Sequence, residues 1–278
     1  MTPQKNIVWL ASYPKSGNTW VRIFLANYFA NEDKPLSIND AGRFGFGDSA
    51  ASMYRKVAGG PIDPNNKRQI LALRPHLLKA IASNGASVNF IKTHNVDSQV
   101  FGVDLIPPQP TRTAIYIVRN PLDVTLSFAR HFAMSHDAAV ETMGRSNYVT
   151  ESNAKQVTEY RASWSDHVTS WTQEKRFPVV LLRYEDMLQD PAKAFEGMLT
   201  RAALPVDRAR IEKAVRFSSF EEVSKQEKEG GFKETSEVAD QFFTFGTSGQ
   251  WQTELAPELV EKVRKQHRKM MKKHGYLE

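Results

Sequence analysis

Short apolar segments alternate with longer amphipathic segments along most of the chain. The apolar segments are rich in Val, Ile and Leu and are bounded by polar residues, which is typical of buried strands. They predict strands at 7–12, 88–93, 113–118 and 179–183.

The amphipathic segments between them have the periodicity of helices. They predict helices at 19–29, 75–83, 121–131, 156–174, 191–199, 207–215, 219–229 and 257–273. Pro121, Pro191 and Pro257 suit the first turn of a helix, where no backbone N–H is needed. The spacing of Trp164, Val168 and Trp171 favours a core-facing stripe. The alternation predicts an α/β fold with three layers, a central and mostly parallel sheet covered by helices on both faces.

Two stretches, 31–66 and 132–152, have no clear periodicity. Both contain aromatic residues and methionines, which either line a ligand site or anchor surface loops. If they line a site, we expect an apolar pocket for an aromatic or aliphatic alcohol. Its candidate residues are Phe44, Phe46, Met53, Tyr54, Phe132 and Met134.

Composition narrows the classes of function. The 278 residues include no cysteine, which excludes disulfides, thiolate nucleophiles and cysteine-ligated metals. The net charge of +6 suits an anionic ligand, and no basic run with interleaved aromatics indicates nucleic acid. No apolar stretch is long enough to span a bilayer, and residues 1–6 carry no signal-peptide core. We therefore expect a cytoplasmic protein that binds no nucleic acid.

The segment from Ser12 to Trp20, Ser-Tyr-Pro-Lys-Ser-Gly-Asn-Thr-Trp, joins a predicted strand to a predicted helix. This geometry directs free backbone N–H groups and the positive end of the helix dipole at an anion. Lys15 adds a charge, and Gly17 allows close backbone approach. Short polar side chains that can donate hydrogen bonds follow or flank it: Ser16, Asn18 and Thr19. The segment predicts a phosphate or sulfate-ester site.

This segment is not a Walker A loop, because Lys15 precedes its only glycine. The order Tyr-Pro-Lys-Ser-Gly-x-Thr-Trp instead resembles the loop that binds the 5′-phosphosulfate of PAPS (3′-phosphoadenosine 5′-phosphosulfate) in cytosolic-type sulfotransferases, including bacterial small-molecule enzymes. The resemblance implies a P-loop-like fold in which residues 1–278 form one sulfotransferase domain, with 31–66 and 132–152 as loops on the acceptor side.

A second motif, Phe90-Ile91-Lys92-Thr93-His94, ends a predicted strand. Residues at the carboxyl ends of parallel strands face the ligand crevice, and Lys92 and His94 should point to the same side. Histidine can accept a proton near neutral pH. Lys-Thr-His is also similar to the family segment that carries the general base and a neighbouring lysine.

A third motif begins with Arg119 and runs Arg-Asn-Pro-Leu-Asp-Val-Thr-Leu-Ser to Ser127. Arg119 follows a strand and Ser127 lies two turns into the next helix, so both can reach one phosphate. Alternatively, Arg119 forms a surface ion pair with Asp123. The pattern is similar to the family segment that binds the 3′-phosphate of PAPS.

A fourth motif, Leu181-Leu182-Arg183-Tyr184-Glu185-Asp186, closes another strand. The resemblance implies that Tyr184 contacts the adenine and that Trp20 and Phe220 hold the purine between them, although either aromatic could belong to the core. Base–aromatic stacking contributes about 1–3 kcal/mol per base. Without the resemblance, Glu185 and Asp186 could be metal-binding carboxylates of a kinase or NTPase.

The last motif, from Gly246 to Trp251, fits the family's Gly-x-x-Gly-x-Trp. The family usually has Arg-Lys before the first glycine, where this chain has Thr244 and Phe245. The change removes charge-assisted hydrogen bonds worth about 1.5–3 kcal/mol each. Backbone N–H groups near Gly246 or one of three lysines could compensate: Lys225, Lys228 and Lys233.

Five motifs in order imply a PAPS-dependent sulfotransferase that needs no metal. By resemblance, His94 is the base, Lys15 and Lys92 stabilise the transferring group, and Ser127 contacts Lys15 or the 3′-phosphate. The acceptor is expected to be a small molecule, an alcohol or a peptide natural product. A kinase or NTPase and a catalytically inactive binding relative remain the alternatives. The family's dimerisation pattern is not recognisable after Trp251, so a homodimer is possible without support from the sequence.

Overall fold

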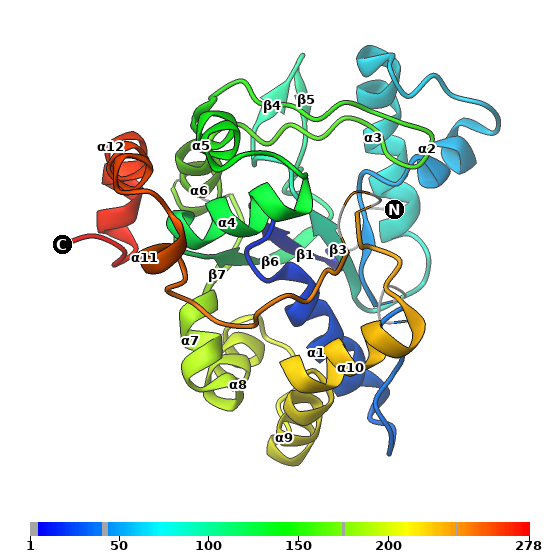
Figure 1. The fold of residues 1–278 in the computed structure, drawn as a ribbon. Coiled ribbons are helices and arrows are strands. Elements are labelled where there is room, and N and C mark those ends of the chain that lie inside the picture. Colours follow the sequence, from blue (N-terminus) through cyan, green and yellow to red (C-terminus); the bar gives the residue numbers. More distant parts are fainter. Residues whose placement is uncertain (1–4, 41–43, 174–175, 237, 239) are drawn as a thin grey trace.

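The computed structural model of the chain describes residues 5–40, 44–173, 176–236, 238 and 240–278 (Figure 1). Three parts of the sequence-based predictions lie outside these residues: 1–4 of the N-terminal segment, 41–43 of the first irregular stretch, and the last residue of the 156–174 helix.

A five-stranded parallel sheet lies at the centre of the fold, in the order β2-β3-β1-β6-β7. Its strands are β1 Ile7–Ser12, β2 Phe46–Gly47, β3 Asn89–Thr93, β6 Thr111–Val118 and β7 Val179–Arg183. A short antiparallel hairpin, β4 Gln99–Val100 with β5 Val103–Asp104, stands apart from it. The four predicted strands are confirmed within two residues. β2 was not predicted, because two residues carry no periodicity.

Helices cover both faces of the sheet, which confirms the three-layer α/β prediction (Figure 1). Along β1, Trp9 and Ala11 face one hydrophobic cluster, while Val8 and Leu10 face another. The described helices are α1 Asn18–Ala30, α2 Ala51–Ala58, α3 Lys67–Ala82, α4 Pro121–His131, α5 His136–Gly144, α6 Trp164–Thr172, α7 Tyr184–Gln189, α8 Pro191–Arg201, α9 Arg208–Phe217, α10 Phe220–Gly230, α11 Trp251–Glu254 and α12 Pro257–Lys273.

Each cluster joins the sheet to its own set of helices. The cluster containing Trp9 includes residues of α3, α4, α6 and α12, and the predicted stripe of Trp164, Val168 and Trp171 is fully buried in it. The cluster containing Leu10 includes residues of α1, α8 and α9. Burying apolar surface at about 25 cal/mol per Å² makes these two interfaces the main source of stability.

Two predicted helix starts are wrong. α3 begins at Lys67, where the side chain of Asn66 accepts a hydrogen bond from the Gln69 N–H, and it continues through Pro75. The burial of its apolar face offsets the cost of an internal proline, about 3 kcal/mol. The helix predicted at 156–174 begins only at Trp164, because Ser163 caps it through Asp166. Residues before it instead form isolated bridges, Ala50 with Gln156 and Val149 with Tyr160.

The two stretches predicted to be irregular also contain regular structure. Residues 31–66 include β2 and α2, and residues 132–152 include α5, which Ser135 caps. These elements are short, so their periodicity is weak over the windows that sequence patterns need. Among the described residues, no helix has the length and apolar character required to cross a membrane.

Candidate active site

The register of the sheet brings the predicted motifs to one edge. Ala11 of β1 lies opposite Thr93 of β3 and Tyr116 of β6. The three strands therefore end together, and the turn after β1, His94 after β3 and Arg119 after β6 emerge at the same carboxyl edge. Ligands bind at this edge in open α/β sheets.

The turn between β1 and α1, residues 13–17, has an unusual backbone. Lys15 and Gly17 have positive φ angles of 67° and 102°, and in the described chain no side chain caps the start of α1. The uncapped N–H groups of the helix are therefore available to an anion. A Cβ at position 17 would lie 2.7 Å from Cδ2 of Tyr184, so only glycine fits.

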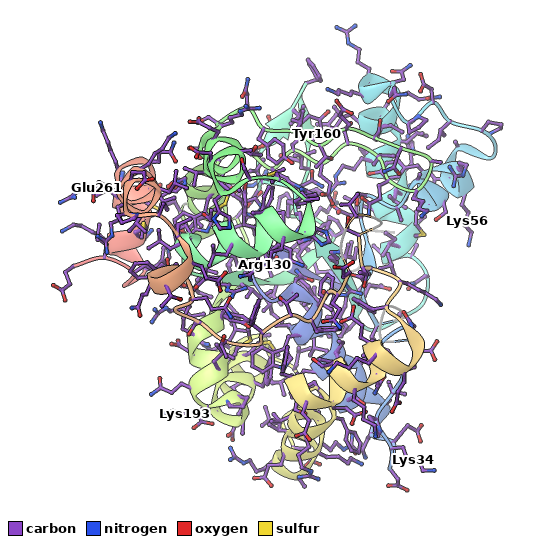
Figure 2. All side chains as sticks on the ribbon, viewed as in Figure 1. Lys34, Lys56, Arg130, Tyr160, Lys193 and Glu261 are labelled. Carbon is purple, nitrogen blue, oxygen red and sulfur yellow. The ribbon has the colours of Figure 1, made fainter. Side chains whose placement is uncertain are left out.

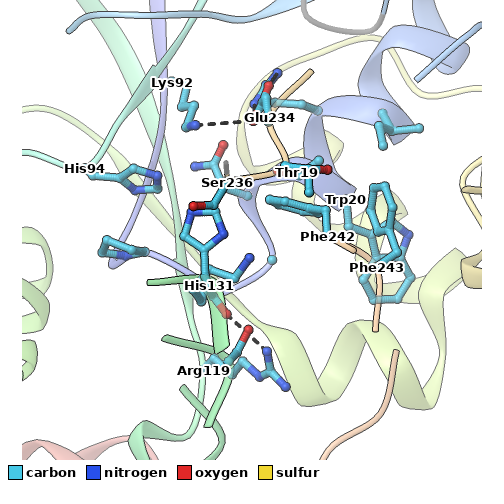
Figure 3. Close-up of a pocket in the computed structure, with 18 of the residues that line it drawn as sticks. Thr19, Trp20, Lys92, His94, Arg119, His131, Glu234, Ser236, Phe242 and Phe243 are labelled. Atoms are coloured by element: carbon cyan, nitrogen blue, oxygen red, sulfur yellow. Dashed lines mark hydrogen bonds and ion pairs between the residues drawn. The ribbon is translucent and has the colours of Figure 1, made fainter. Parts of the chain in front are cut away.

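A cavity of about 700 Å³ opens over this edge (Figure 3). Every residue predicted to bind donor or catalyse the reaction lines it except Ser16, whose side chain is fully buried beneath the turn. The lining residues from the predictions are Lys15, Gly17, Asn18, Thr19, Trp20, Lys92, His94, Arg119, Ser127, Tyr184, Phe220 and Gly246. Lysines and arginines outnumber carboxylates along the wall, as an anion site requires.

The two predicted lysines lie in this cavity and repel each other. Burial, together with the charges of Lys92 and Arg119, lowers the pKa of Lys15 to about 7. Its Nζ lies 3.8 Å from the centre of the Phe242 ring, a cation–π contact. An ammonium group with a depressed pKa gains most from a bound anion, because the anion offsets both burial and repulsion.

A carboxylate that was not predicted occupies the same wall. Glu234 accepts two hydrogen bonds from the Arg22 guanidinium, at 3.0 and 2.6 Å, and Lys92 Nζ lies 3.4 Å from its Oε2 (Figure 3). Burial alone would raise the pKa of Glu234, but Lys92 and Arg22 hold it well below its usual range. Glu234 is therefore ionised and partly neutralises Lys92.

One ring nitrogen of His94, Nδ1, is committed to a backbone carbonyl. Its Nδ1 lies 2.7 Å from the carbonyl oxygen of Ser12, which can only accept, so Nδ1 carries the proton. This leaves Nε2 with a lone pair, as a general base requires. Burial and the charge of Lys92 lower the pKa of His94 to about 3, so the ring is neutral. Negative charge bound at Lys92 would raise that pKa.

His167 holds the backbone of His94 in place. Its Nε2 lies 3.2 Å from the His94 carbonyl oxygen and donates to it, and its Nδ1 accepts from the Tyr116 hydroxyl at 2.9 Å. The His167 and Tyr116 rings are both fully buried in the core. His167 is a positioning residue, and the sequence analysis missed it because its role depends on contacts across the sheet.

Arg119, which follows β6, and Asp123 of α4 each contact distant parts of the chain. The Arg119 guanidinium donates to the carbonyl oxygens of Lys15 and Thr247, at 3.1 and 3.2 Å. The Asp123 carboxylate accepts from the N–H groups of Gly249 and Trp251, at 2.8 and 3.3 Å. The predicted alternative, an ion pair between Arg119 and Asp123, is therefore wrong: each has its own partners.

The aromatic residues predicted to hold the purine line the cavity without stacking on each other. Tyr184 packs under the Arg119 guanidinium at 4.2 Å and edge-on to Trp20 at 5.9 Å. Phe220 is 39% exposed, and the backbone of Gly246 packs against its ring closely enough to exclude a Cβ. Gly246 is thus required by this close approach.

The carboxylates of the fourth motif do not face the cavity. Glu185 accepts from the backbone N–H of Asn120 and from the Tyr276 hydroxyl, both at 2.9 Å, and Asp186 pairs with Arg183 on the surface. Neither lines the cavity. The geometry does not favour the kinase or NTPase alternative. In the part of the chain that the structure describes, no cluster of three or more His, Asp or Glu side chains could hold a metal ion.

The acceptor pocket expected from the sequence is mostly wrong. Phe46 and Phe132 line the cavity, but Phe44, Met53, Tyr54 and Met134 pack into the hydrophobic clusters. Polar residues missed by the sequence analysis complete this side of the wall: Ser49, His131, Glu159 and Arg161. His131 follows Ser127 by one helical turn, a spacing that could have identified it.

Glu159 and Arg161 form a buried ion pair near His94. The Arg161 guanidinium donates to Oε2 of Glu159 at 3.0 and 2.6 Å, and Ser49 donates to Oε1 at 2.9 Å. Burial would raise the pKa of Glu159, but Arg161 and His94 lower it to about 2. These residues lie in the segment predicted to be helical, which explains why they were missed.

We call the described residues between α10 and α11 (231–236, 238 and 240–250) the strap. Several of them line the cavity, and Figure 1 shows this segment in orange crossing in front of α1 and β6. It contributes Glu234, Phe242, Phe245 and Gly246 to the wall. The strap therefore brings the last predicted motif to the turn after β1, although the two are far apart in the sequence.

Comparison with known proteins identifies the family. Residues 5–275 match the model of the sulfotransferase domain. The chain is 24% identical over 275 residues to sulfotransferase 1 family member D1 of Rattus norvegicus, covering 95% of this chain and 83% of that protein. It is 24% identical over 278 residues to flavonol 3-sulfotransferase of Flaveria bidentis, covering 94% and 80%.

Solved structures show the same fold. Retinol dehydratase in complex with androsterone and the inactive cofactor PAP matches with a TM-score of 0.66 at 16% identity, over 97% of this chain and 81% of that one. A mouse sulfotransferase complexed with PAP matches with a TM-score of 0.59 at 20% identity, over 96% and 85%. Because the family model covers nearly the whole chain, this protein belongs to the sulfotransferase domain family.

Proposed function

We propose that this chain transfers a sulfuryl group from PAPS to a hydroxyl or amine of a small-molecule acceptor, with adenosine 3′,5′-bisphosphate as the second product. One observation carries the proposal. A neutral His94 with an unprotonated Nε2 lines the same cavity as Lys15, Lys92 and the uncapped start of α1. A base beside an anion site is what this transfer requires, and a protein that only bound the nucleotide would not need it.

The residues of the donor side suit an adenosine nucleotide with phosphates at two positions. The start of α1 and Lys15 offer N–H groups and charge to one anionic group, and Arg119 and Ser127 offer them to another. Trp20 Nε1 and Arg119 Nε are buried without a hydrogen-bond partner among the described residues. Unpaired buried donors are costly, and a polar ligand would satisfy them. The two structural relatives named above contain PAP.

His94 performs the proton transfer in this mechanism. Its Nε2 accepts the proton of the attacking hydroxyl or amine, while the acceptor forms a bond to sulfur and the bond from sulfur to the 5′-phosphate oxygen breaks. Such a base contributes about 10²–10⁴-fold in rate. The Ser12 carbonyl fixes the tautomer that makes this possible.

The lysines stabilise the charge that develops. Lys15 donates to the oxygen that leaves with the 5′-phosphate, and Lys92 contacts the oxygens of the transferring group. Both tasks are electrostatic, and they contribute most in a cavity from which water is excluded. Lys92 must first leave Glu234, its partner in this structure.

The acceptor side of the cavity favours a partly apolar alcohol. Phe46 and Phe132 offer apolar surface near His94, and Glu159, Arg161 and Ser49 offer polar contacts. One relative is named a flavonol sulfotransferase, and retinol dehydratase structures contain androsterone or retinol. We propose an aromatic or aliphatic alcohol as the acceptor, ahead of a peptide natural product.

We also propose that residues 1–278 act as one domain in the cytoplasm. Both hydrophobic clusters pack on the same sheet, and the family model spans residues 5–275. The cytoplasmic assignment follows from the resemblance of the motifs to cytosolic-type enzymes.

Calorimetry and a transfer assay test the function. Adenosine 3′,5′-bisphosphate should bind with EDTA present, and should bind more tightly than ATP with magnesium. Labelled sulfate from PAPS should then appear on one or more members of a panel of phenols, sterols and long-chain alcohols. If the bisphosphate does not bind, the donor assignment is wrong. If it binds and no acceptor is labelled across the hydroxyl and amine classes, the inactive alternative holds.

A further inference from the structure

The 3′-phosphate site of the donor lacks the two cations that resemblance would place before Gly246. Thr244 and Phe245 occupy those positions, and neither carries charge. Of the three lysines that could compensate, Lys225 and Lys228 do not line the cavity. Lys233 does, but it precedes Glu234, which lies at Lys92 rather than at Arg119. A cation that replaces the missing pair would therefore lie on another part of the wall.

Arg130 lies where this charge is missing. It follows Ser127 by three residues on α4, which places both on one helix face, and both line the cavity. Its guanidinium lies 4.5 Å from the centre of the Phe245 ring and donates to the Gln250 side chain at 3.3 Å. In the view of Figure 2, Arg130 lies near the centre of the face shown, whereas Lys56 and Lys193 lie at the periphery.

Arg119 and Arg130 hold the same part of the strap. Arg119 donates to the Thr247 carbonyl, and Arg130 contacts Phe245 and Gln250 on either side of it. Two guanidinium groups therefore flank Gly246. Each offers the planar pair of donors that matches a phosphate.

In this structure Arg130 also pairs with Glu254 of α11. That carboxylate is 37% exposed, and Arg130 is 29% exposed. Exposed ion pairs contribute little to stability, so Arg130 can exchange Glu254 for a stronger anion. The Phe245 ring would keep the guanidinium at the mouth of the cavity during that exchange.

We propose that Arg130 supplies the cation for the 3′-phosphate of the donor, in place of the family's Arg-Lys pair, and that Phe245 positions it. The proposal rests on the function proposed above. It makes Arg130 a specificity-determining residue that distinguishes nucleotides with a 3′-phosphate from those without one. Glu254 competes with that phosphate for Arg130.

Two ligands separate this role from a general structural one. Calorimetry would compare adenosine 3′,5′-bisphosphate with adenosine 5′-monophosphate, which lacks the 3′-phosphate. Arg130→Gln should weaken bisphosphate binding about tenfold or more and leave monophosphate binding within twofold. Arg130→Lys should recover part of the loss. Arg264→Gln is the matched control, because Arg264 packs on Trp251 at 5.6 Å outside the cavity, and it should change neither affinity.

A second variant should change bisphosphate affinity in the opposite direction. Glu254→Gln should tighten bisphosphate binding a few-fold and leave the monophosphate unchanged. The proposal is overturned if Arg130→Gln weakens both ligands equally, or neither, or if Glu254→Gln weakens the bisphosphate. If the wild-type protein binds neither nucleotide, the proposed function itself fails, and this outcome is distinct from all the others.

Discussion

The turn after β1 and the strap line the same cavity, but they are held in place in different ways. The turn is continuous with a fully buried strand and with α1, which packs into the cluster around Leu10. The strap lies outside that cluster, and its Phe232, Phe242 and Phe243 pack with Ile23 and Ala26 of α1 in a smaller third cluster. Among its described residues, backbone N–H groups also donate to two buried carboxylates, at the middle of the strap and where it meets α11.

Those carboxylates are Glu227 and Asp123. Glu227 accepts the N–H groups of Phe242 and Phe243 at 2.7 and 2.9 Å, and Asp123 accepts those of Gly249 and Trp251. The strap also places Glu234 on Lys92 and Phe242 on Lys15. The turn thus supplies the backbone N–H groups and Lys15 of the proposed anion site, whereas the strap supplies Glu234 and Phe242, which contact its two lysines.

The largest expected effect comes from His94, which follows β3 at the same edge of the sheet as the turn. His94→Ala removes the base and should lower turnover by about 10²–10⁴-fold. Affinity for adenosine 3′,5′-bisphosphate should stay within a few-fold, because His94 is not expected to contact the nucleotide. Steady-state kinetics and calorimetry measure the two quantities. His76→Ala, on the exposed face of α3, is the control. Unchanged turnover in His94→Ala would remove His94 from the mechanism.

The next effect tests the shape of the turn. Gly17→Ala places a Cβ 2.7 Å from Tyr184 at a φ of 102°, so Tyr184 and Arg119 above it must move. We expect bisphosphate affinity to fall about tenfold or more, alongside a loss of about 1–2 kcal/mol in stability from the left-handed backbone. Gly59→Ala is a matched control, since its φ is 71° and nothing lies within 4 Å of the added Cβ.

The control variant should lose similar stability in thermal unfolding and keep full nucleotide affinity. Equal affinity in both variants would show that the close approach of Tyr184 to Gly17 does not shape the donor site.

The same contrast explains what the sequence predicted. The bounds of β1, β7, α4 and α12 agree with the prediction to the residue, because apolar runs and first-turn prolines are local signals. The turn motif is equally local, because it lies directly between a predicted strand and a predicted helix, and the sequence therefore predicted its position. α3 and α6 start elsewhere because their caps, Asn66 and Ser163, compete with other polar residues nearby.

The strap side could not be predicted in this way. Arg22 and Glu234 are 212 positions apart, and nothing in either neighbourhood indicates that they pair. From the sequence alone, Arg130 is a solvated residue of an amphipathic helix; only the structure shows that it packs on Phe245. Glu159 and Arg161 reach the cavity only because residues 156–162 are not helical. These side chains depend on long-range contacts that a single sequence does not encode as a pattern.

A smaller effect is expected in the strap, where a substitution should raise bisphosphate affinity instead of lowering it. Glu234→Gln removes the charge that competes for Lys92, and we expect bisphosphate affinity to rise about 3–10-fold, equivalent to about 0.7–1.4 kcal/mol. Glu229→Gln, an exposed site on α10, should have no effect. Thermal unfolding should accompany the titration, because Arg22 loses its charged partner. Weaker nucleotide binding by a folded Glu234→Gln protein would contradict a competing role.

The smallest expected effect is the uptake of a fraction of one proton when the nucleotide binds. It tests whether the turn and the strap both act through Lys15. In the absence of ligand the pKa of Lys15 is about 7, lowered by burial and by Lys92 and Arg119, so at pH 8 most molecules carry a neutral Lys15. A bound anion stabilises the charged form and raises that pKa. Binding at pH 8 should therefore take up protons, and affinity should fall as pH rises from 7 to 8.5.

Calorimetry in buffers of different ionisation enthalpy measures the uptake. Lys15→Met should abolish it, and Glu234→Gln should enlarge it because Glu234 raises the pKa of Lys15. Uptake that persists in Lys15→Met would assign the proton to another group, and the turn would then bind its anion without a change in the charge of Lys15.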